Sequence, residues 1–295
     1  MTLWKKTMPP SQFEQFLRDN DLPMTMLDQL TSVYQPIADF IVESNRERND
    51  RVFGINGSQG SGKSTLCRAL QWLLHRRGRR AAILSIDDLY LDQGRRAELA
   101  RQVHPLLETR GVPGTHDVAL GIDTLDALRD RRAVALPRFD KANDDPCPRH
   151  RWPIQIKPVD VVLFEGWCVA SLPQAEADLE TSVNGLEARE DGDGHWRRYV
   201  NDRLAGPYRG LFRRIDRLIL LEVADFSWVY GWRKKQEDRL RQRQTGSRIM
   251  DDRTLARFIE HFERITRHNA KTLPYLADIR LLLDQSQRIE RHLIR

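Results

Sequence analysis

The sequence GSQGSGKS at residues 57–64 limits what this 295-residue chain can fold into more than any other feature. It has the spacing G-x-x-x-x-G-K-S and lies between the apolar run at residues 52–55 and a segment typical of a helix, which starts at Lys63. Glycines in this pattern let successive backbone N–H groups point inward, and the following helix N-terminus adds partial positive charge. The pattern predicts a phosphate-binding loop. The alternative, a glycine-rich turn without a nucleotide, is disfavoured by the strand-loop-helix context.

The loop predicts ATP and Mg²⁺ as cofactors. Lys63 is expected to reach the β- and γ-phosphates, and the Ser64 hydroxyl is expected to bind Mg²⁺. The predicted nucleotide-binding residues are Gly57, Ser58, Gln59, Gly60, Ser61, Gly62, Lys63, Ser64 and Thr65.

Composition narrows the class of protein. Hydrophobic residues make up 40% and charged residues 31% of the chain, which is typical of a soluble globular protein. No apolar run is long enough to span a bilayer, and the N-terminus lacks the apolar core of a signal peptide. The three cysteines lie far apart without a C-x-x-C pair, which argues against a disulfide framework or a zinc site. We therefore expect a cytoplasmic protein without a membrane partner.

The net charge of +6 leaves the kind of partner open. Arginines are spread over the whole length, and no nucleic-acid-binding motif is present. A small-molecule substrate is therefore predicted, and a nucleic-acid partner is not.

The order of apolar segments predicts an α/β fold. Residues 1–50 are expected to form a helical N-terminal extension, and residues 51–295 a domain built around the P-loop, for which the Gly57–Ser64 motif and the acids that follow later strands suggest a kinase. Short apolar runs typical of buried parallel strands lie at residues 51–56, 81–86, 159–166, 216–221 and 277–283.

Two acids, Asp87 and Asp88, follow the second of these strands. Neighbouring strand residues point to opposite sides, so only one of the two can face the phosphates. We favour Asp87 as the carboxylate that orients an acceptor hydroxyl and takes its proton. The alternative is that the pair caps the following helix.

Glu165 ends the apolar run at residues 159–166, the position of an acid that helps to hold Mg²⁺ either directly or through water. A glutamate at a buried strand end is costly without a cationic partner. Ser64 and Glu165 are therefore the predicted metal ligands.

Four further residues are candidates for substrate binding. His116 and Asp117 follow a loop rich in glycine and proline, and Arg138 and Lys141 follow a short apolar run. Arginine binds carboxylates through a bidentate fork, so a small acid suits this region. On the residues alone, ordinary surface positions are equally compatible for all four.

The basic segment from residue 228 to about 244 is predicted to be a helix. As a lid it would present Arg233 to the transferred phosphoryl group, a catalytic role. The alternative is a basic surface helix. The acidic, glycine-rich stretch at residues 171–194 is predicted to be an exposed loop.

Seven segments together resemble the phosphate-loop glycerate kinases, the D-glycerate 3-kinase family. They are GINGSQGSGKST, LSIDDLYL, RGVPGTHD, LPRFDKANDD, FEGWCV, WRxxQE and the ERIT near residue 263. The resemblance covers roughly residues 50–285 and extends more distantly to phosphoribulokinase, uridine kinase and pantothenate kinase.

The resemblance implies a P-loop NTPase fold with a five-stranded parallel sheet in the order 2-3-1-4-5, flanked by helices, and a mobile lid. It places Asp87 at the catalytic acid, within the pattern D-x-[FL]-Y, and Glu165 at the Mg²⁺ carboxylate. It places His116, Asp117 and Arg138 in the acceptor site.

The first functional hypothesis is therefore an ATP-dependent kinase that converts D-glycerate to 3-phosphoglycerate. The second is a related kinase acting on another hydroxylated small molecule, such as a nucleoside, pantothenate or a sugar phosphate. The third is a nucleic-acid-associated P-loop NTPase, which would show salt-dependent polymer binding.

Overall fold

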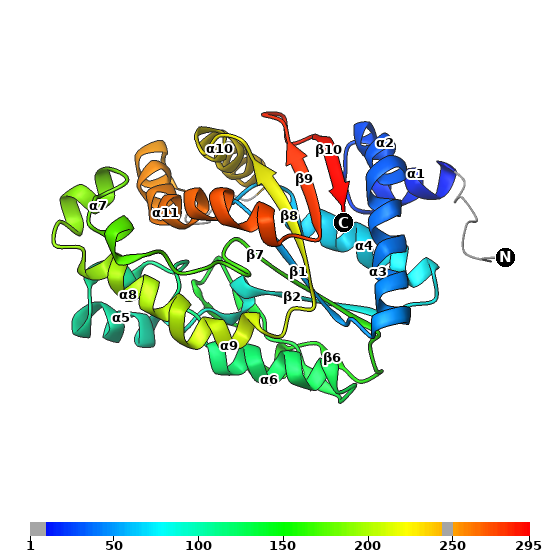
Figure 1. The fold of residues 1–295 in the computed structure, drawn as a ribbon, viewed down its shortest axis with the longest axis horizontal. Coiled ribbons are helices and arrows are strands. Elements are labelled where there is room, and N and C mark those ends of the chain that lie inside the picture. Colours follow the sequence, from blue (N-terminus) through cyan, green and yellow to red (C-terminus); the bar gives the residue numbers. More distant parts are fainter. Residues whose placement is uncertain (1–9, 244–249) are drawn as a thin grey trace.

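A six-stranded sheet forms the centre of the protein in the computed structural model, which describes residues 10–243 and 250–295 (Figure 1). The strands lie in the spatial order β10-β9-β8-β1-β7-β2. Five are parallel, and β10 is antiparallel to β9. Their bounds are β1 (Val52–Gly57), β2 (Ala81–Ser85), β7 (Val161–Gly166), β8 (Arg217–Val223), β9 (Ile279–Leu283) and β10 (Ile289–Ile294).

The predicted α/β class with a mainly parallel sheet is confirmed. Numbered along the chain, the parallel strands β2-β7-β1-β8-β9 lie in the order 2-3-1-4-5. The expected count of five strands omitted β10, whose residues are all partly or fully exposed. Because an edge strand of this kind lacks the apolar run of a buried one, its sequence does not show it.

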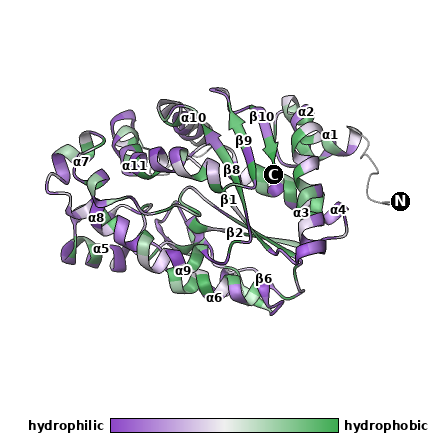
Figure 2. Ribbon diagram, viewed as in Figure 1, coloured by the Kyte–Doolittle hydropathy of each residue, from purple (hydrophilic) through white to green (hydrophobic). Residues whose placement is uncertain are grey.

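The central strands are apolar because helices cover the sheet on both sides. All residues of β1 and β7 are buried, whereas β2, at the edge, alternates between buried and half-buried positions. Figure 2 shows hydrophobic residues along the strands and hydrophilic ones on the outer helices. Because these strands are parallel, their carboxyl ends lie at the same edge of the sheet.

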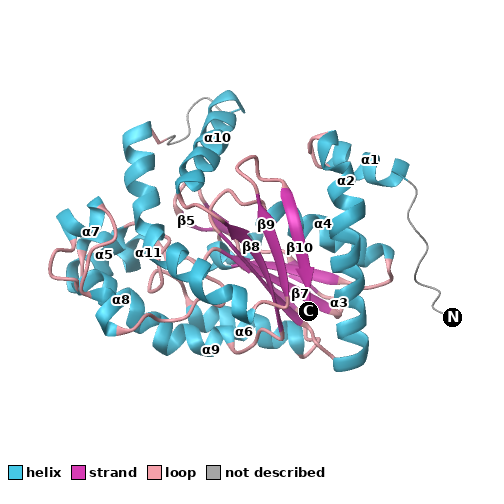
Figure 3. Ribbon diagram, turned by 45° about the horizontal axis from the view of Figure 1, so that its top comes forward, coloured by secondary structure: helices cyan, strands magenta, loops and turns pink. Residues whose placement is uncertain are grey.

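Two helical layers enclose this sheet (Figure 3). On one face, α1 (Pro10–Asp19), α3 (Gln35–Arg48) and α4 (Lys63–Arg76) share a core with the strands. On the other face, a second core joins the sheet to α6 (Val118–Arg129), α8 (His195–Arg203), α9 (Arg209–Phe212) and α11 (Asp252–Leu276).

The N-terminal residues pack against the P-loop helix. Phe13 and Phe16 of α1 contact Trp72 of α4, with ring centroids 5.5 and 4.9 Å apart. Between α1 and α3 lie η1 (Met24–Met26), α2 (Leu27–Gln29) and the π-helical turn η2 (Leu30–Tyr34). The division of the chain at residue 50 stays a prediction.

Several further elements complete the described part of the chain. They are α5 (Gln93–Gln102), α7 (Gly185–Glu190), α10 (Ser227–Arg243), η3 (Ile86–Leu89), η4 (Pro105–Glu108), η5 (Arg149–Arg151), η6 (Glu176–Leu179), η7 (Leu204–Tyr208), and the paired strands β3 (Val134–Ala135) with β6 (Ile154–Gln155) and β4 (Phe139–Asp140) with β5 (Asp145–Pro146). Across the described ranges, no helix combines the length and the apolar character needed to cross a bilayer.

The acidic stretch at residues 171–194 is not a wholly exposed loop, so that prediction is wrong for two of its acids. Glu187 is fully buried and binds Arg264 of α11 through two hydrogen bonds of 2.7 and 2.6 Å. Asp191 is likewise buried and pairs with Arg197 at 3.0 Å. The arginines that neutralise these carboxylates include one from a distant helix, which the local composition of the stretch does not show.

Candidate active site

The phosphate loop joins β1 to α4 in the predicted strand-loop-helix arrangement. Gly60 and Gly62 have φ angles of +78° and +96°, a region that residues with a Cβ atom rarely adopt. The Lys63 ammonium donates a hydrogen bond of 3.0 Å to the Ser58 carbonyl, so its side chain lies along the loop. The loop leads directly into the N-terminus of α4, which begins at Lys63, and this is the arrangement that anion binding requires.

Two segments from the C-terminal part of the chain, α10 (Ser227–Arg243) and the turn after β9, contact the phosphate loop. A Cβ atom added at Gly60 would lie only 2.7 Å from Cβ of Trp232 in α10. The Gln287 side chain, which follows β9, donates a hydrogen bond to the Gly60 carbonyl. Helix α10 therefore lies directly against the phosphate loop.

The two predicted metal ligands meet beside this loop. The Ser64 hydroxyl donates a hydrogen bond of 2.9 Å to the Glu165 carboxylate, which is buried at the end of β7. Both groups offer only oxygen atoms, the ligands that Mg²⁺ prefers, and Mg²⁺ normally uses few protein ligands beside phosphate and water. This donor set fits the ion.

Asp87 lies one strand further along the same edge. Its carboxylate accepts hydrogen bonds from the Tyr90 hydroxyl at 2.8 Å and from the Lys141 ammonium at 2.7 Å. Burial alone would raise the pKa of Asp87, but the charge and hydrogen bonds of Lys141 and Tyr90 outweigh it, and the net pKa is lowered. Asp87 is therefore an ionised carboxylate at neutral pH.

Asp88 points to different partners. Its carboxylate accepts hydrogen bonds from the Phe139 backbone N–H at 3.1 Å and from the Arg138 guanidinium at 3.2 Å. Burial raises the pKa of Asp88, although Arg138 opposes this effect. The predicted substrate-binding residue Arg138 is thus paired with Asp88, which also binds the backbone of the next residue, Phe139.

One cleft of about 550 Å³ joins these groups. Its charged and polar lining comprises Gln59, Lys63, Ser64, Thr65, Arg68, Ser85, Asp87, Asp88, Tyr90, Arg110, Lys141, Glu165, Arg233 and Gln236. The structure therefore brings the phosphate loop, both strand-end acids, Lys141 and Arg233 to one site.

Of the predicted substrate-binding residues, His116, Asp117 and Arg138 are not among the lining residues. His116 stacks on Tyr90 with ring centroids 4.6 Å apart, and its Nδ1 lies 2.5 Å from the Tyr208 hydroxyl. Burial lowers the pKa of His116 to about 3, so the ring is neutral at physiological pH. Asp117 caps α6 by accepting the Leu120 N–H at 3.0 Å and pairs with Arg95 at 2.9 Å. His116 supports the wall of the cleft from behind.

Arg233 projects from α10 toward the cleft. Its guanidinium pairs with Glu237 and donates a hydrogen bond of 2.8 Å to the Gln236 side chain. The predicted lid motion stays a prediction, and residues 244–249, which follow α10, lie outside the described residues.

Sequence reasoning missed two lining side chains that the structure makes prominent. Tyr90 binds Asp87, and Arg110 lies over the Phe139 ring, with its guanidinium carbon 5.5 Å from the ring centroid. Both lie inside segments that carry the family resemblance, LSIDDLYL and RGVPGTHD. Their place inside these two segments is the feature of the sequence that could have indicated a role for them.

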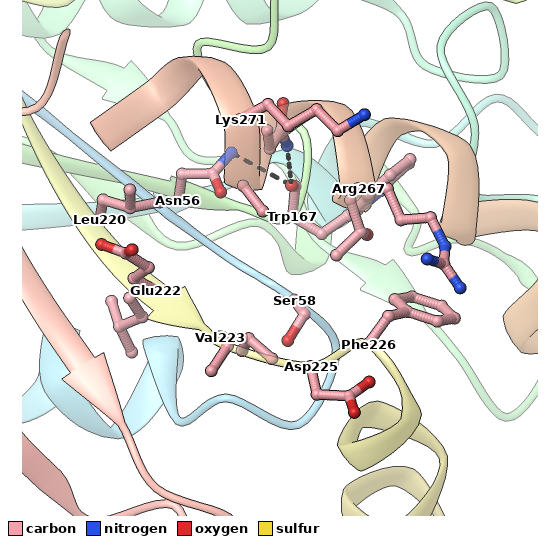
Figure 4. Close-up of a pocket in the computed structure, with 15 residues that line it drawn as sticks. Asn56, Ser58, Trp167, Leu220, Glu222, Val223, Asp225, Phe226, Arg267 and Lys271 are labelled. Carbon is pink, nitrogen blue, oxygen red and sulfur yellow. Dashed lines mark hydrogen bonds between the residues drawn. The ribbon is translucent and has the colours of Figure 1, made fainter. Parts of the chain in front are cut away.

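Trp167 lines both this cleft and a second cavity of about 280 Å³ between β8 and α11, which Figure 4 shows. The Asn56 and Asn269 amides both donate to the Trp167 carbonyl, at 3.1 and 3.3 Å. The Trp167 indole N–H donates to the Gly111 carbonyl at 3.0 Å. Trp167 is therefore held at both ends as a fixed wall of the site.

The phosphate loop, the strand-end acids and the parallel sheet define a class: the protein has the fold and the site of a P-loop nucleotide-binding protein, and its relatives are kinases. It is 34% identical over 221 residues to the uncharacterized kinase mug58 of Schizosaccharomyces pombe, and the match covers 72% of this chain and 78% of mug58. It is 33% identical over 223 residues to the chloroplastic D-glycerate 3-kinase of Arabidopsis thaliana, covering 72% of this chain and 46% of that protein. The chain belongs to the D-glycerate 3-kinase family of P-loop kinases.

A solved structure shows the same fold. The D-glycerate 3-kinase from Cryptococcus neoformans superposes with a TM-score of 0.74 at 24% identity, covering 90% of this chain and 99% of the other. A family model described as methylmalonyl Co-A mutase-associated GTPase MeaB matches residues 24–94. That match contains the phosphate loop but less than half of the chain, so it indicates the shared nucleotide-binding unit only.

Proposed function

We propose that the protein is an ATP-dependent D-glycerate 3-kinase that forms 3-phosphoglycerate. The observation that carries the proposal is the single cleft in which the phosphate loop, Glu165 and Asp87 converge. The Arabidopsis relative that bears this name supports the choice of acceptor.

In the proposed reaction, the phosphate loop binds the β- and γ-phosphates of ATP. The Asp87 carboxylate orients the acceptor hydroxyl and takes its proton as the oxygen bonds to the γ-phosphorus and the bond to ADP breaks. Lys63 and Arg233 neutralise charge on the phosphoryl oxygens. Tyr90, which stacks on the neutral His116 ring, binds Asp87 and keeps it in place.

Ser64 and Glu165 are the residues that would hold Mg²⁺. The bound ion supplies positive charge beside the β- and γ-phosphates. The two side chains are already 2.9 Å apart, so the site needs little rearrangement to share one ion.

An acceptor screen tests the proposal. Purified protein with Mg²⁺ and ATP is expected to release ADP in the presence of D-glycerate, and much more slowly with L-glycerate, pantothenate or uridine. Phosphorus NMR of the product is expected to show phosphate on the 3-hydroxyl. Preference for another acceptor would contradict the proposed substrate but not the kinase class.

Removing one metal ligand is expected to raise the Mg²⁺ requirement. In Glu165→Gln the carboxylate charge is lost while the shape is kept, so half-maximal turnover should need about 10- to 100-fold more Mg²⁺. Turnover measured against Mg²⁺ concentration checks this. The matched control is Glu222→Gln, an acid of β8 that pairs with Arg280 and lies outside the cleft lining. An unchanged Mg²⁺ dependence in Glu165→Gln would remove this residue from the metal site.

The pH dependence of kcat/KM is expected to report the partners of Asp87. Because the net pKa of Asp87 is lowered, the carboxylate stays ionised as the pH falls through the ordinary aspartate range near pH 4. In Lys141→Met, burial remains while the compensating charge is lost, so the pKa rises. The acidic decline of kcat/KM should then begin at higher pH than in the wild type. Tyr90→Phe should shift it in the same direction by less, and a profile identical to wild type in both variants would contradict the assignment of Asp87 as the base.

A further inference from the structure

We infer that Arg110 binds the carboxylate of the acceptor and so selects hydroxy acids over neutral alcohols. This inference rests on the proposed function and adds a residue to which no role was assigned. Five cationic side chains line the cleft: Lys63, Arg68, Arg110, Lys141 and Arg233.

The other four cations, Lys63, Arg68, Lys141 and Arg233, each bind a group of the protein. Lys63 and Arg68 belong to α4 and hydrogen-bond to the Ser58 and Ser64 carbonyls of the phosphate-loop region. Lys141 is paired with Asp87, and Arg233 lies on α10 with Glu237. Arg110 belongs to neither α4 nor α10, and its guanidinium lies beside the Phe139 ring.

The surroundings of Arg110 leave one positive charge at the cleft. Arg110 pairs with Asp144, but Arg96, whose side chain is only 2% exposed, binds the same carboxylate at 2.9 Å. Two guanidinium groups share one carboxylate, so the cluster carries a net charge of +1. Among the described residues, Asp144 is the ion-pair partner of Arg110, and a guanidinium that shares its carboxylate is suited to bind a second one in a bidentate fork.

Arg110 and Asp87 line the same cleft and are joined by a chain of side-chain contacts. The Tyr90 hydroxyl lies 2.8 Å from Asp87, the Tyr90 and Phe139 rings lie 5.2 Å apart, and the guanidinium carbon of Arg110 lies 5.5 Å from the Phe139 ring. One wall of the cleft thus presents a base for a hydroxyl at one end and a cation for a carboxylate at the other.

The backbone at this point is built for close packing. Gly111 has a φ angle of +142°, and a Cβ atom there would lie 2.5 Å from the Phe262 ring. The loop that carries Arg110 is therefore seated against α11, which limits the positions its side chain can take.

The test compares the binding of D-glycerate with that of D-glyceramide, which has the same shape without the charge. Calorimetry with a non-hydrolysable ATP analogue and Mg²⁺ gives both dissociation constants. In Arg110→Gln, D-glycerate affinity is expected to fall about 10- to 100-fold while D-glyceramide affinity changes little, because a hydrogen-bonded charge is lost. Arg110→Lys keeps the charge without the fork and should fall in between.

Arg101→Gln, an exposed arginine on α5, is the matched control, and thermal unfolding confirms that each variant is folded. Equal losses for both ligands, or unchanged D-glycerate binding in Arg110→Gln, would overturn the role of Arg110. Wild-type protein that fails to bind D-glycerate would instead overturn the proposed function.

Discussion

Asp87→Asn is expected to lose about 10²- to 10⁴-fold in turnover while ATP binding stays close to that of the wild type. The amide has the shape of the carboxylate and can still accept the Tyr90 hydrogen bond, but it cannot take a proton from the acceptor. Asp87 is not part of the phosphate loop, so nucleotide contacts should persist. Single-turnover phosphoryl transfer and nucleotide titration separate the two effects.

Asp88→Asn is the matched control for this experiment, since it makes the same chemical change one residue away. Asp88 holds Arg138 and the Phe139 backbone, so its loss should disturb the loop at residues 138–141 and reduce turnover much less. Near-normal turnover in Asp87→Asn would show that the base is misassigned.

Lys63→Ala is expected to weaken ATP binding and to slow turnover together. The ammonium is the cation of the phosphate loop, and a hydrogen bond to a charged group contributes about 1.5–3 kcal/mol, or about 10- to 100-fold in affinity. Loss of a preorganised donor at the transferred group costs a further 10²- to 10³-fold in rate, approximately. Burial lowers the pKa of Lys63, and the Glu165 carboxylate opposes that effect.

The control for Lys63→Ala is Lys157→Ala, an exposed lysine before β7 that lies outside this cleft. Equilibrium titration with a fluorescent ATP analogue and steady-state turnover measure both effects. Unchanged ATP affinity in Lys63→Ala would contradict the assignment of the phosphate loop.

The placement of the chemistry at one edge of the sheet followed from local sequence. Each of the five parallel strands is a short apolar run, because a strand covered on both faces excludes polar residues. Asp87 and Glu165 follow two such runs, and the topology of a parallel sheet brings their carboxyl ends to the same edge. The glycine spacing and the flanking strand and helix patterns predicted the phosphate loop, since its conformation depends on residues adjacent in the chain.

Contacts between distant segments were decided only by the tertiary structure. Arg138 pairs with Asp88, and Arg110 shares Asp144 with Arg96. Glu187 is buried against Arg264 of α11, although its own stretch has the composition of an exposed loop. The sequence by itself determined the nucleotide-binding class and the strand-end acids, because these depend on neighbouring residues. Local spacing does not show which arginine lies at the proposed acceptor site and which neutralises a buried acid, because this depends on packing between residues far apart in the chain.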